Sequence, residues 1–171
     1  MSDSSSKQVS IMDWLKALIP GYSGYLKLEH RRESDRRTRQ YISERISDCK
    51  NLLREHLKVY LDHAELEAIA SGDKLRSGLE MLQQQVDSQI DNYSNWFTDE
   101  TAKGSVLDRL SELDASTVSD IDRIAKYLAD PTVPTTEKLN VDISKALEVC
   151  RELRDKLDRR AKILRGESNN S

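Results

Sequence analysis

Four residues with metal-binding or acid–base side chains recur along one predicted helix. His56, Tyr60, His63 and Glu67 lie four, three and four positions apart, which places them on one side of a helix. Di-metal sites in helical bundles need a Glu-x-x-His pair on each of two helices. The residues three positions before His56 and His63 are Leu53 and Tyr60. We therefore expect no metal ion and no cofactor.

The sequence also lacks the short motifs that carry most nucleophilic and phosphate chemistry. It contains no nucleophile elbow, P-loop, Gly-x-Gly-x-x-Gly or His-Glu-x-x-His motif. All three histidines lie between residues 30 and 63, so no catalytic triad is apparent. The predicted helix seams are filled with Leu, Ile and Val, which leaves few inward polar groups for a site built from distant residues. The sequence predicts a protein that is not an enzyme.

Two cysteines suggest the compartment. Cys49 and Cys150 both fall on apolar positions of predicted helices, which is typical of buried thiols in a reducing environment. They form no Cys-x-x-Cys pair and have no neighbouring histidine, so no zinc site is expected. The first residues lack the apolar core of a signal peptide. We expect a cytoplasmic protein.

A basic stretch covers residues 27–39, with six Lys or Arg against three Asp or Glu and no apolar residue after Leu28. One interpretation is a solvated helix stabilised by pairs of opposite charges four positions apart. The other is a basic surface for anionic lipid or an acidic partner, since each cation near a charged membrane contributes about 1 kcal/mol. Nucleic acid is not expected, because no aromatic side chain lies between the arginines to stack on bases. The candidate contact residues are Arg31, Arg32, Arg36, Arg37 and Arg39.

A short amphipathic helix is predicted just before this stretch, from Ser10 to the Pro20-Gly21 stop. Its apolar side could enter a membrane interface, or it could fold back and cap the end of a helical bundle. The glycines at 21 and 24 indicate a hinge after it. Two tyrosines in the hinge could lie at either kind of interface. The candidate contact residues of this segment are Trp14, Leu15, Leu18, Ile19, Tyr22 and Tyr25.

Composition sets the class of fold. The chain has 171 residues, 33% of them charged, with only 6 Gly and 3 Pro, which suits one helical domain. The net charge is −3, but residues 1–57 carry 11 basic against 8 acidic groups, residues 58–135 carry 7 against 15, and residues 136–171 carry 9 against 7. The basic ends and acidic middle could set which helices pack together, or let two copies associate in an antiparallel sense.

Apolar residues spaced three and four apart predict the long helices. We expect one helix over 26–69, ended by Ser71-Gly72-Asp73, a second over 73–97, one or two over 105–129, and a last one over 136–164. They should form an elongated, antiparallel, coiled-coil-like bundle of three to four helices over 26–165, with the basic start of the first long helix projecting. Residues 1–9 and 166–171 are predicted to be disordered tails, and 10–25 the short helix and hinge.

Three aromatic residues close the predicted second long helix. Tyr93, Trp96 and Phe97 suit an apolar plug at the end of the bundle, and an alternative is a hot spot for a partner.

One segment resembles a known family. The residues Ile19-Pro20-Gly21-Tyr22-Ser23-Gly24-Tyr25, followed by Glu29, Arg31-Arg32-Glu33, Asp35-Arg36 and Arg39, resemble an N-terminal signature of uncharacterised bacterial helical proteins. The resemblance covers about 20 residues and implies no activity. It implies a bacterial cytoplasmic source and marks the hinge and the basic stretch as the working part of the family.

These observations favour a non-catalytic scaffold or adaptor. We expect it to act through protein–protein contacts or self-association, with the basic N-terminal end of the long helix as the docking surface. The alternative is a peripheral membrane protein anchored on anionic lipid by the amphipathic helix and the arginines.

Overall fold

A computed structural model of the chain describes residues 10–63, 65–90, 96–98, 100, 104–129 and 135–167. The described part contains the helices α1 (Ile11–Leu18), α2 (Leu28–Asp62), α3 (Leu66–Asp87), α4 (Gly104–Leu128) and α5 (Thr136–Leu164). Two 3-10 turns, η1 (Ser88–Ile90) and η2 (Trp96–Thr98), lie between α3 and α4. No strand occurs in these ranges, so the predicted all-α class is confirmed.

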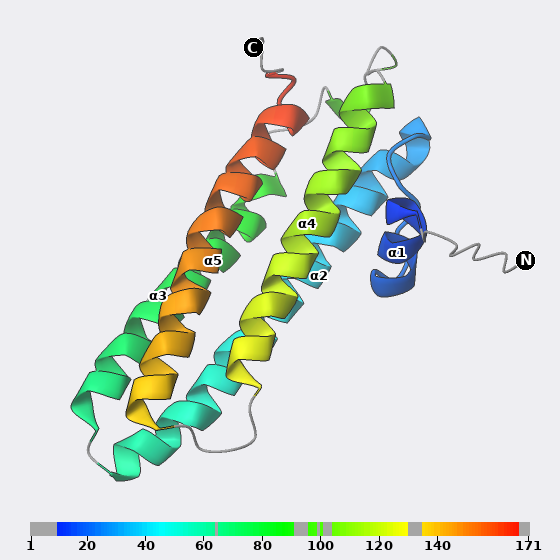
Figure 1. The fold of residues 1–171 in the computed structure, drawn as a ribbon. Coiled ribbons are helices and arrows are strands. Elements are labelled where there is room, and N and C mark those ends of the chain that lie inside the picture. Colours follow the sequence, from blue (N-terminus) through cyan, green and yellow to red (C-terminus); the bar gives the residue numbers. More distant parts are fainter. Residues whose placement is uncertain are drawn as a thin grey trace, which may run out of the picture.

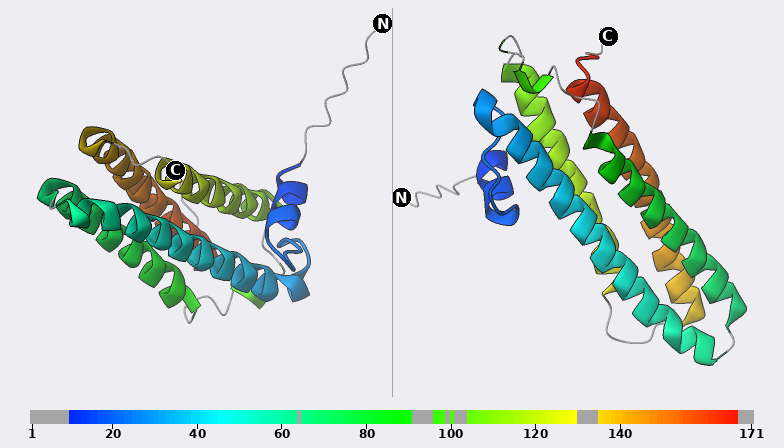
Figure 2. Two further views of the ribbon diagram at one scale, coloured as in Figure 1. Left: turned by 90° about the horizontal axis from the view of Figure 1, so that it is seen from below. Right: turned by 180° about the vertical axis from the view of Figure 1, so that it is seen from behind.

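The four long helices form a bundle in which α2 packs against α3 and α4, and α5 packs against the same two helices (Figure 1). The α2–α3 and α4–α5 pairs run antiparallel, as expected. The α2–α4 and α3–α5 pairs run parallel, because α3 and α4 lie diagonally across the bundle from each other (Figure 2). The expectation that neighbours are antiparallel therefore holds for two of the four packed pairs, and α4 begins at Gly104, well after α3 ends at Asp87.

The core consists mainly of aliphatic side chains spaced three and four residues apart on each long helix, as the sequence predicts. Each long helix turns a stripe of residues three and four apart toward the other helices. Among the buried members are Ile42, Ile46, Cys49 and Leu53 on α2, Leu75, Leu79, Leu82 and Val86 on α3, Leu110, Val118 and Ile121 on α4, and Leu139, Ile143, Cys150, Leu153 and Leu157 on α5.

The boundary between the first two long helices differs from the prediction. α2 ends at Asp62 and α3 begins at Leu66, so Gly72 lies inside a helix rather than ending one. A Cβ atom at Gly72 would lie 2.5 Å from both methyl carbons of Leu57. The glycine therefore allows α2 and α3 to approach closely, which is the other common reason for a glycine in a helix.

The sequence is compatible with one helix or two over residues 105–129, and the structure has a single helix there, α4. Its Ser116-Thr117 pair causes no break, because the Thr117 hydroxyl donates to the carbonyl oxygen of Leu113 at 2.8 Å, inside the helix.

The helix predicted over 73–97 is shorter than expected. α3 ends at Asp87, and Phe97 belongs to the separate turn η2, where it is buried. Tyr93 and the side chain of Trp96 lie outside the described residues, as do the predicted tails except for Gly166 and Glu167. Of the predicted three-residue plug, the structure therefore describes only the side chain of Phe97.

Candidate functional site

The N-terminal segment folds back onto the bundle. The Ser10 hydroxyl accepts a hydrogen bond from the amide of Asp13 at 3.1 Å and so caps α1, as predicted. α1 packs against α4 on the flank of the bundle (Figure 1), rather than at its end. Leu15 and Ile19 are fully buried there, whereas Trp14 and Leu18 are half-buried against the same core.

The predicted hinge is held by its two tyrosines. Gly21 and Gly24 adopt positive φ angles of 79° and 81°, so the expected turn is confirmed. Tyr22 and Tyr25 are both buried and meet edge to face, with ring centroids 5.9 Å apart. The apolar face that the membrane hypothesis assigns to lipid is thus engaged in contacts within the chain.

A cluster of buried charged side chains lies where this segment meets α2, α4 and α5. Nε of Arg160 donates to Oδ1 of Asp114 at 2.7 Å, and Nη2 of Arg160 lies 2.8 Å from Oδ1 of Asp35. The Tyr25 hydroxyl donates to the other oxygen of Asp114 at 2.6 Å. Arg160, Asp114 and Asp35 are each at most 3% exposed. The guanidinium of Arg160 on α5 therefore connects α2, α4 and the N-terminal turn.

The cluster perturbs the pKa of its members. Burial, and then the charge of Asp114, raise the pKa of Tyr25 well above its usual value. Burial also raises the pKa of the Asp114 carboxyl, although Arg160 and Tyr25 oppose this. For Arg160, burial lowers the pKa, but Asp114 and Asp35 outweigh it and hold the pKa well above its usual value. Arg160 is therefore a permanent cation inside the protein.

The first turns of α2 attach the N-terminal turn through polar contacts. Arg31 is buried and donates from Nε to the carbonyl oxygen of Tyr25 at 2.9 Å. Ser34 is fully buried and donates to the carbonyl oxygen of Gly24 at 2.8 Å. Arg39 donates to Asp35 at 2.9 Å. These contacts explain why an apolar stripe is missing in this part of α2.

The expectation of a solvated helix with opposite charges three and four positions apart holds only in part. Glu33–Arg37 and Asp35–Arg39 are such pairs, but Arg31 is buried. Arg31 and Arg39 are turned into the cluster, and the guanidinium of Arg32 lies 5.1 Å from the centre of the Phe97 ring. Arg32 and Arg36 are exposed. The side chains of Arg36 and Arg37 are 55% and 38% exposed, and both form ion pairs with Glu33.

Sequence reasoning missed Asp114 and Arg160, although their positions carry a signal. Asp114 lies four residues from both Leu110 and Val118, on the inward stripe of its helix. Arg160 lies three residues after the buried Leu157. A charged residue on an apolar stripe needs a partner of opposite charge. Because Asp114 and Arg160 are both on such stripes and have opposite charges, the sequence offers them as a buried ion pair.

A different part of the molecule exposes apolar side chains. Leu61 at the end of α2 is 58% exposed, and Leu66 at the start of α3 is 77% exposed. A groove of about 310 Å³ runs from this end between the two helices. It is lined by Lys50, Leu53, Arg54, Leu57, Lys58 and Leu61 of α2 and by Asp73, Arg76 and Glu80 of α3.

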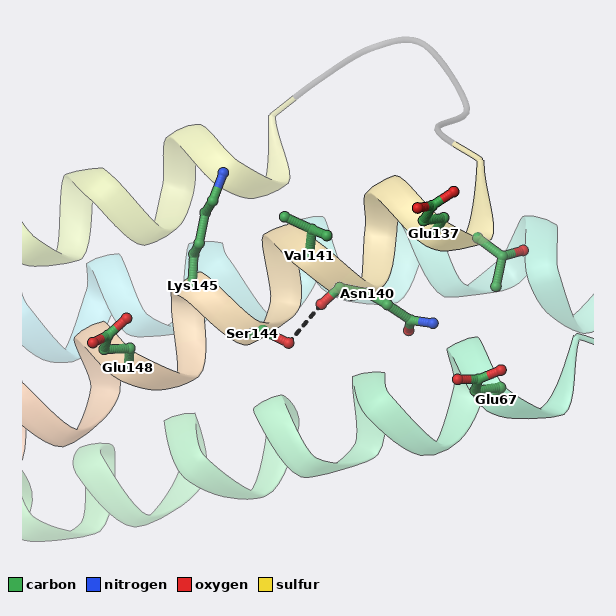
Figure 3. Close-up of a pocket in the computed structure, with 8 residues that line it drawn as sticks. Glu67, Glu137, Asn140, Val141, Ser144, Lys145 and Glu148 are labelled. Atoms are coloured by element: carbon green, nitrogen blue, oxygen red, sulfur yellow. Dashed lines mark hydrogen bonds between the residues drawn. The ribbon is translucent and has the colours of Figure 1, made fainter.

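A second groove, of about 570 Å³, lies between α3 and α5 (Figure 3). Its walls carry Glu67, Glu137 and Glu148 against the single cation Lys145. The Ser144 hydroxyl donates to the carbonyl oxygen of Asn140 at 2.8 Å, so it forms a hydrogen bond within α5. Among the described residues that line this groove there is no histidine or cysteine, and they provide no nucleophile paired with a base.

The remaining reactive side chains are in structural positions. Burial raises the pKa of the Cys49 thiol to about 11 and that of Cys150 to about 12, and both cysteines are free. The prediction of two buried thiols is confirmed. The ring of His56 contacts the carbonyl oxygen of Leu128, and His63 is exposed. In the described ranges, no three His, Cys, Asp or Glu side chains are grouped so that they could hold a metal ion.

The fold and its sites define a class: an all-α four-helix bundle with an N-terminal segment docked on its flank. No protein family, curated protein or solved structure matches this chain. Among the described helices, none combines the length and the apolar character needed to cross a bilayer.

Proposed function

We propose that this chain is a non-catalytic helical adaptor that acts through protein–protein contacts made at the exposed end of the α2–α3 hairpin. The observation that carries the proposal is the exposure of Leu61 and Leu66 beside a leucine-lined groove. Covering apolar surface contributes about 25 cal/mol per Å², and exposed apolar patches of this kind are typical of interaction sites.

The basic N-terminal end is a weaker docking surface than the sequence indicates. Its arginines already have partners inside the chain, among them Asp35, Glu33 and the Phe97 ring. A ligand would have to compete with these contacts, which reduces the net free energy of binding. The membrane alternative requires Leu15 and Ile19 to leave the core as well.

Site-specific photo-crosslinking in cells of the source organism tests the proposal. A photoreactive phenylalanine analogue replaces Leu61 or Leu66 in the full chain. The control replaces Leu26, which is 69% exposed and lies beside the basic end. We expect discrete protein adducts from positions 61 and 66 and few from position 26. Adducts from position 26 alone, or from none of the three, would contradict the proposal.

A further inference from the structure

The two edges of the groove between α2 and α3 differ in charge. The α2 edge carries three cations, Lys50, Arg54 and Lys58. The α3 edge carries Asp73, Arg76 and Glu80, with Arg76 only 3.1 Å from Asp73. On the α2 edge, Glu55 lies 2.8 Å from Nζ of Lys58. With Glu55 counted, the edges have formal charges of +2 and −1. A surface with edges of opposite sign can be complementary to itself.

The register of the two helices fixes which charges lie at the same height. The amide of Gln83 on α3 accepts from Lys50 at 2.6 Å and donates to Ser47 at 2.9 Å. Further along the hairpin, Gly72 faces Leu57. Because the helices are antiparallel, Glu80 lies near the height of Lys50, and Asp73 near that of Leu57 and Lys58.

We propose that the partner at this groove is a second copy of the chain, bound through a two-fold axis that runs parallel to α2 and α3. This rests on the docking surface of the proposed function. The axis places α2 of one copy over α3 of the other at equal height. Lys50 then faces Glu80 of the second copy, and Lys58 faces its Asp73. Arg54 faces Arg76, whose charge Asp73 offsets.

The same axis covers the exposed apolar side chains. Leu61 lies at the height of Ile69, which is half-buried on α3, and Leu66 lies just beyond it at the hairpin end. The two-fold axis brings α2 leucines of one copy over these α3 residues of the other. A dimer with the copies turned end to end would instead oppose the two basic edges, which is unfavourable.

The groove in Figure 3 does not offer this fit. Three glutamates against one lysine line it, so two copies joined there would oppose like charges. Self-association is thus assigned to the α2–α3 face.

Sedimentation velocity of the purified full chain, between about 1 and 100 µM, tests the dimer. We expect the average sedimentation coefficient to rise with concentration from the monomer value to the dimer value. The double variant Leu61→Glu/Leu66→Glu should remain monomeric, and the control Met81→Glu should dimerise normally, because Met81 is 52% exposed on the side of α3 that faces Arg154 of α5. Circular dichroism melts establish that each variant is folded.

A charge exchange tests the orientation of the axis. Lys50→Glu should weaken the dimer about tenfold, because Glu then faces Glu80. Adding Glu80→Lys should restore dimerisation, because the opposed pair is re-formed with reversed signs. Failure of the second change to restore it overturns the parallel two-fold arrangement.

The remaining outcomes separate the two proposals. A wild-type chain that stays monomeric across the whole range overturns the second copy as partner. If positions 61 and 66 then crosslink to a different protein, the adaptor proposal stands and only the occupant is wrong. If they crosslink to nothing, both proposals fail.

Discussion

Arg160 and Asp114 show how much of this bundle depends on a few buried charges. Both side chains are fully buried, and their partners come from α2 and the N-terminal turn. Burying a charge is costly, and attraction by the opposite charge together with hydrogen bonds offsets that cost. Once one partner is removed, the other remains charged and without compensation.

Asp114→Ala should therefore destabilise the protein by about 3–5 kcal/mol. The measurement is urea unfolding followed by circular dichroism. Asp108→Ala on the same helix is the control, because Asp108 is exposed, and it should change the free energy of unfolding by less than about 0.5 kcal/mol. Equal effects of the two substitutions would contradict the structural role of the cluster.

The buried thiols predict how stability depends on pH. The pKa of Cys49 is raised from 9.0 to about 11, and that of Cys150 from 9.0 to about 12. Above about pH 9 the unfolded chain loses these protons while the folded chain keeps them, so stability falls as pH rises. Thermal melts from pH 8 to 10.5 should show a falling Tm. The variant Cys49→Ala/Cys150→Ala should show a smaller fall in Tm over this pH range. A Tm that falls as steeply in the variant as in the wild type would contradict the contribution of the buried thiols.

At the residue scale, the sequence predicts the aliphatic seams but not the charged cluster. Spacings of three and four suffice to assign Leu110, Val118 and Leu157 to the core. The pairing of Asp114 with Arg160 joins residues 46 positions apart, and it depends on which helices become neighbours. That information is not present in the periodicity of either helix.

At the scale of elements, glycine has two different uses in this chain. Gly21 and Gly24 have positive φ angles in the predicted turn, whereas Gly72 and Gly78 lie inside α3. A glycine that allows two helices to approach looks, in sequence, like one that ends a helix. This explains why the turn at 19–25 was predictable and the boundary between α2 and α3 was placed wrongly.

Two alanine substitutions distinguish these uses. Gly24→Ala should destabilise by about 1–3 kcal/mol, because φ is +81° and the new Cβ would lie 2.8 Å from the Met12 methyl carbon. Gly78→Ala should stabilise by about 0.5–1 kcal/mol, because its Cβ meets only Leu147 at 3.8 Å and alanine favours the helix. Thermal and urea unfolding of each variant measure whether its free energy of unfolding rises or falls. Stabilisation by Gly24→Ala would be inconsistent with the turn described here.

At the scale of the whole molecule, the long helices follow from composition and periodicity, but the bounds of α2 and α3 and the arrangement of the four helices do not. The sequence predicts antiparallel neighbours because short loops impose them. α3 and α4, which are separated by residues 88–103 in the sequence, lie on a diagonal of the bundle, which makes the α2–α4 and α3–α5 pairs parallel. The sequence likewise does not distinguish whether α1 lies against lipid or against the bundle, since either could bury Leu15 and Ile19.

The docking of the N-terminal segment separates a folded adaptor from a membrane-anchored protein. Residues 10–25 are held by the buried Tyr22 and Tyr25, and the amide of Ser23 donates to Ser34 at 3.3 Å. Because these contacts join the segment to α2, α4 and α5, it opens only with a sizeable part of the bundle. Its amide hydrogens should then exchange slowly, and an anionic membrane should not compete for it.

Hydrogen–deuterium exchange over residues 11–25, with and without vesicles containing phosphatidylserine, is the most direct measurement. We expect protection in this segment to approach that of α4 and to be unchanged by the vesicles. Rapid exchange that is slowed only when vesicles are added would contradict a docked N-terminal segment and would favour a membrane anchor.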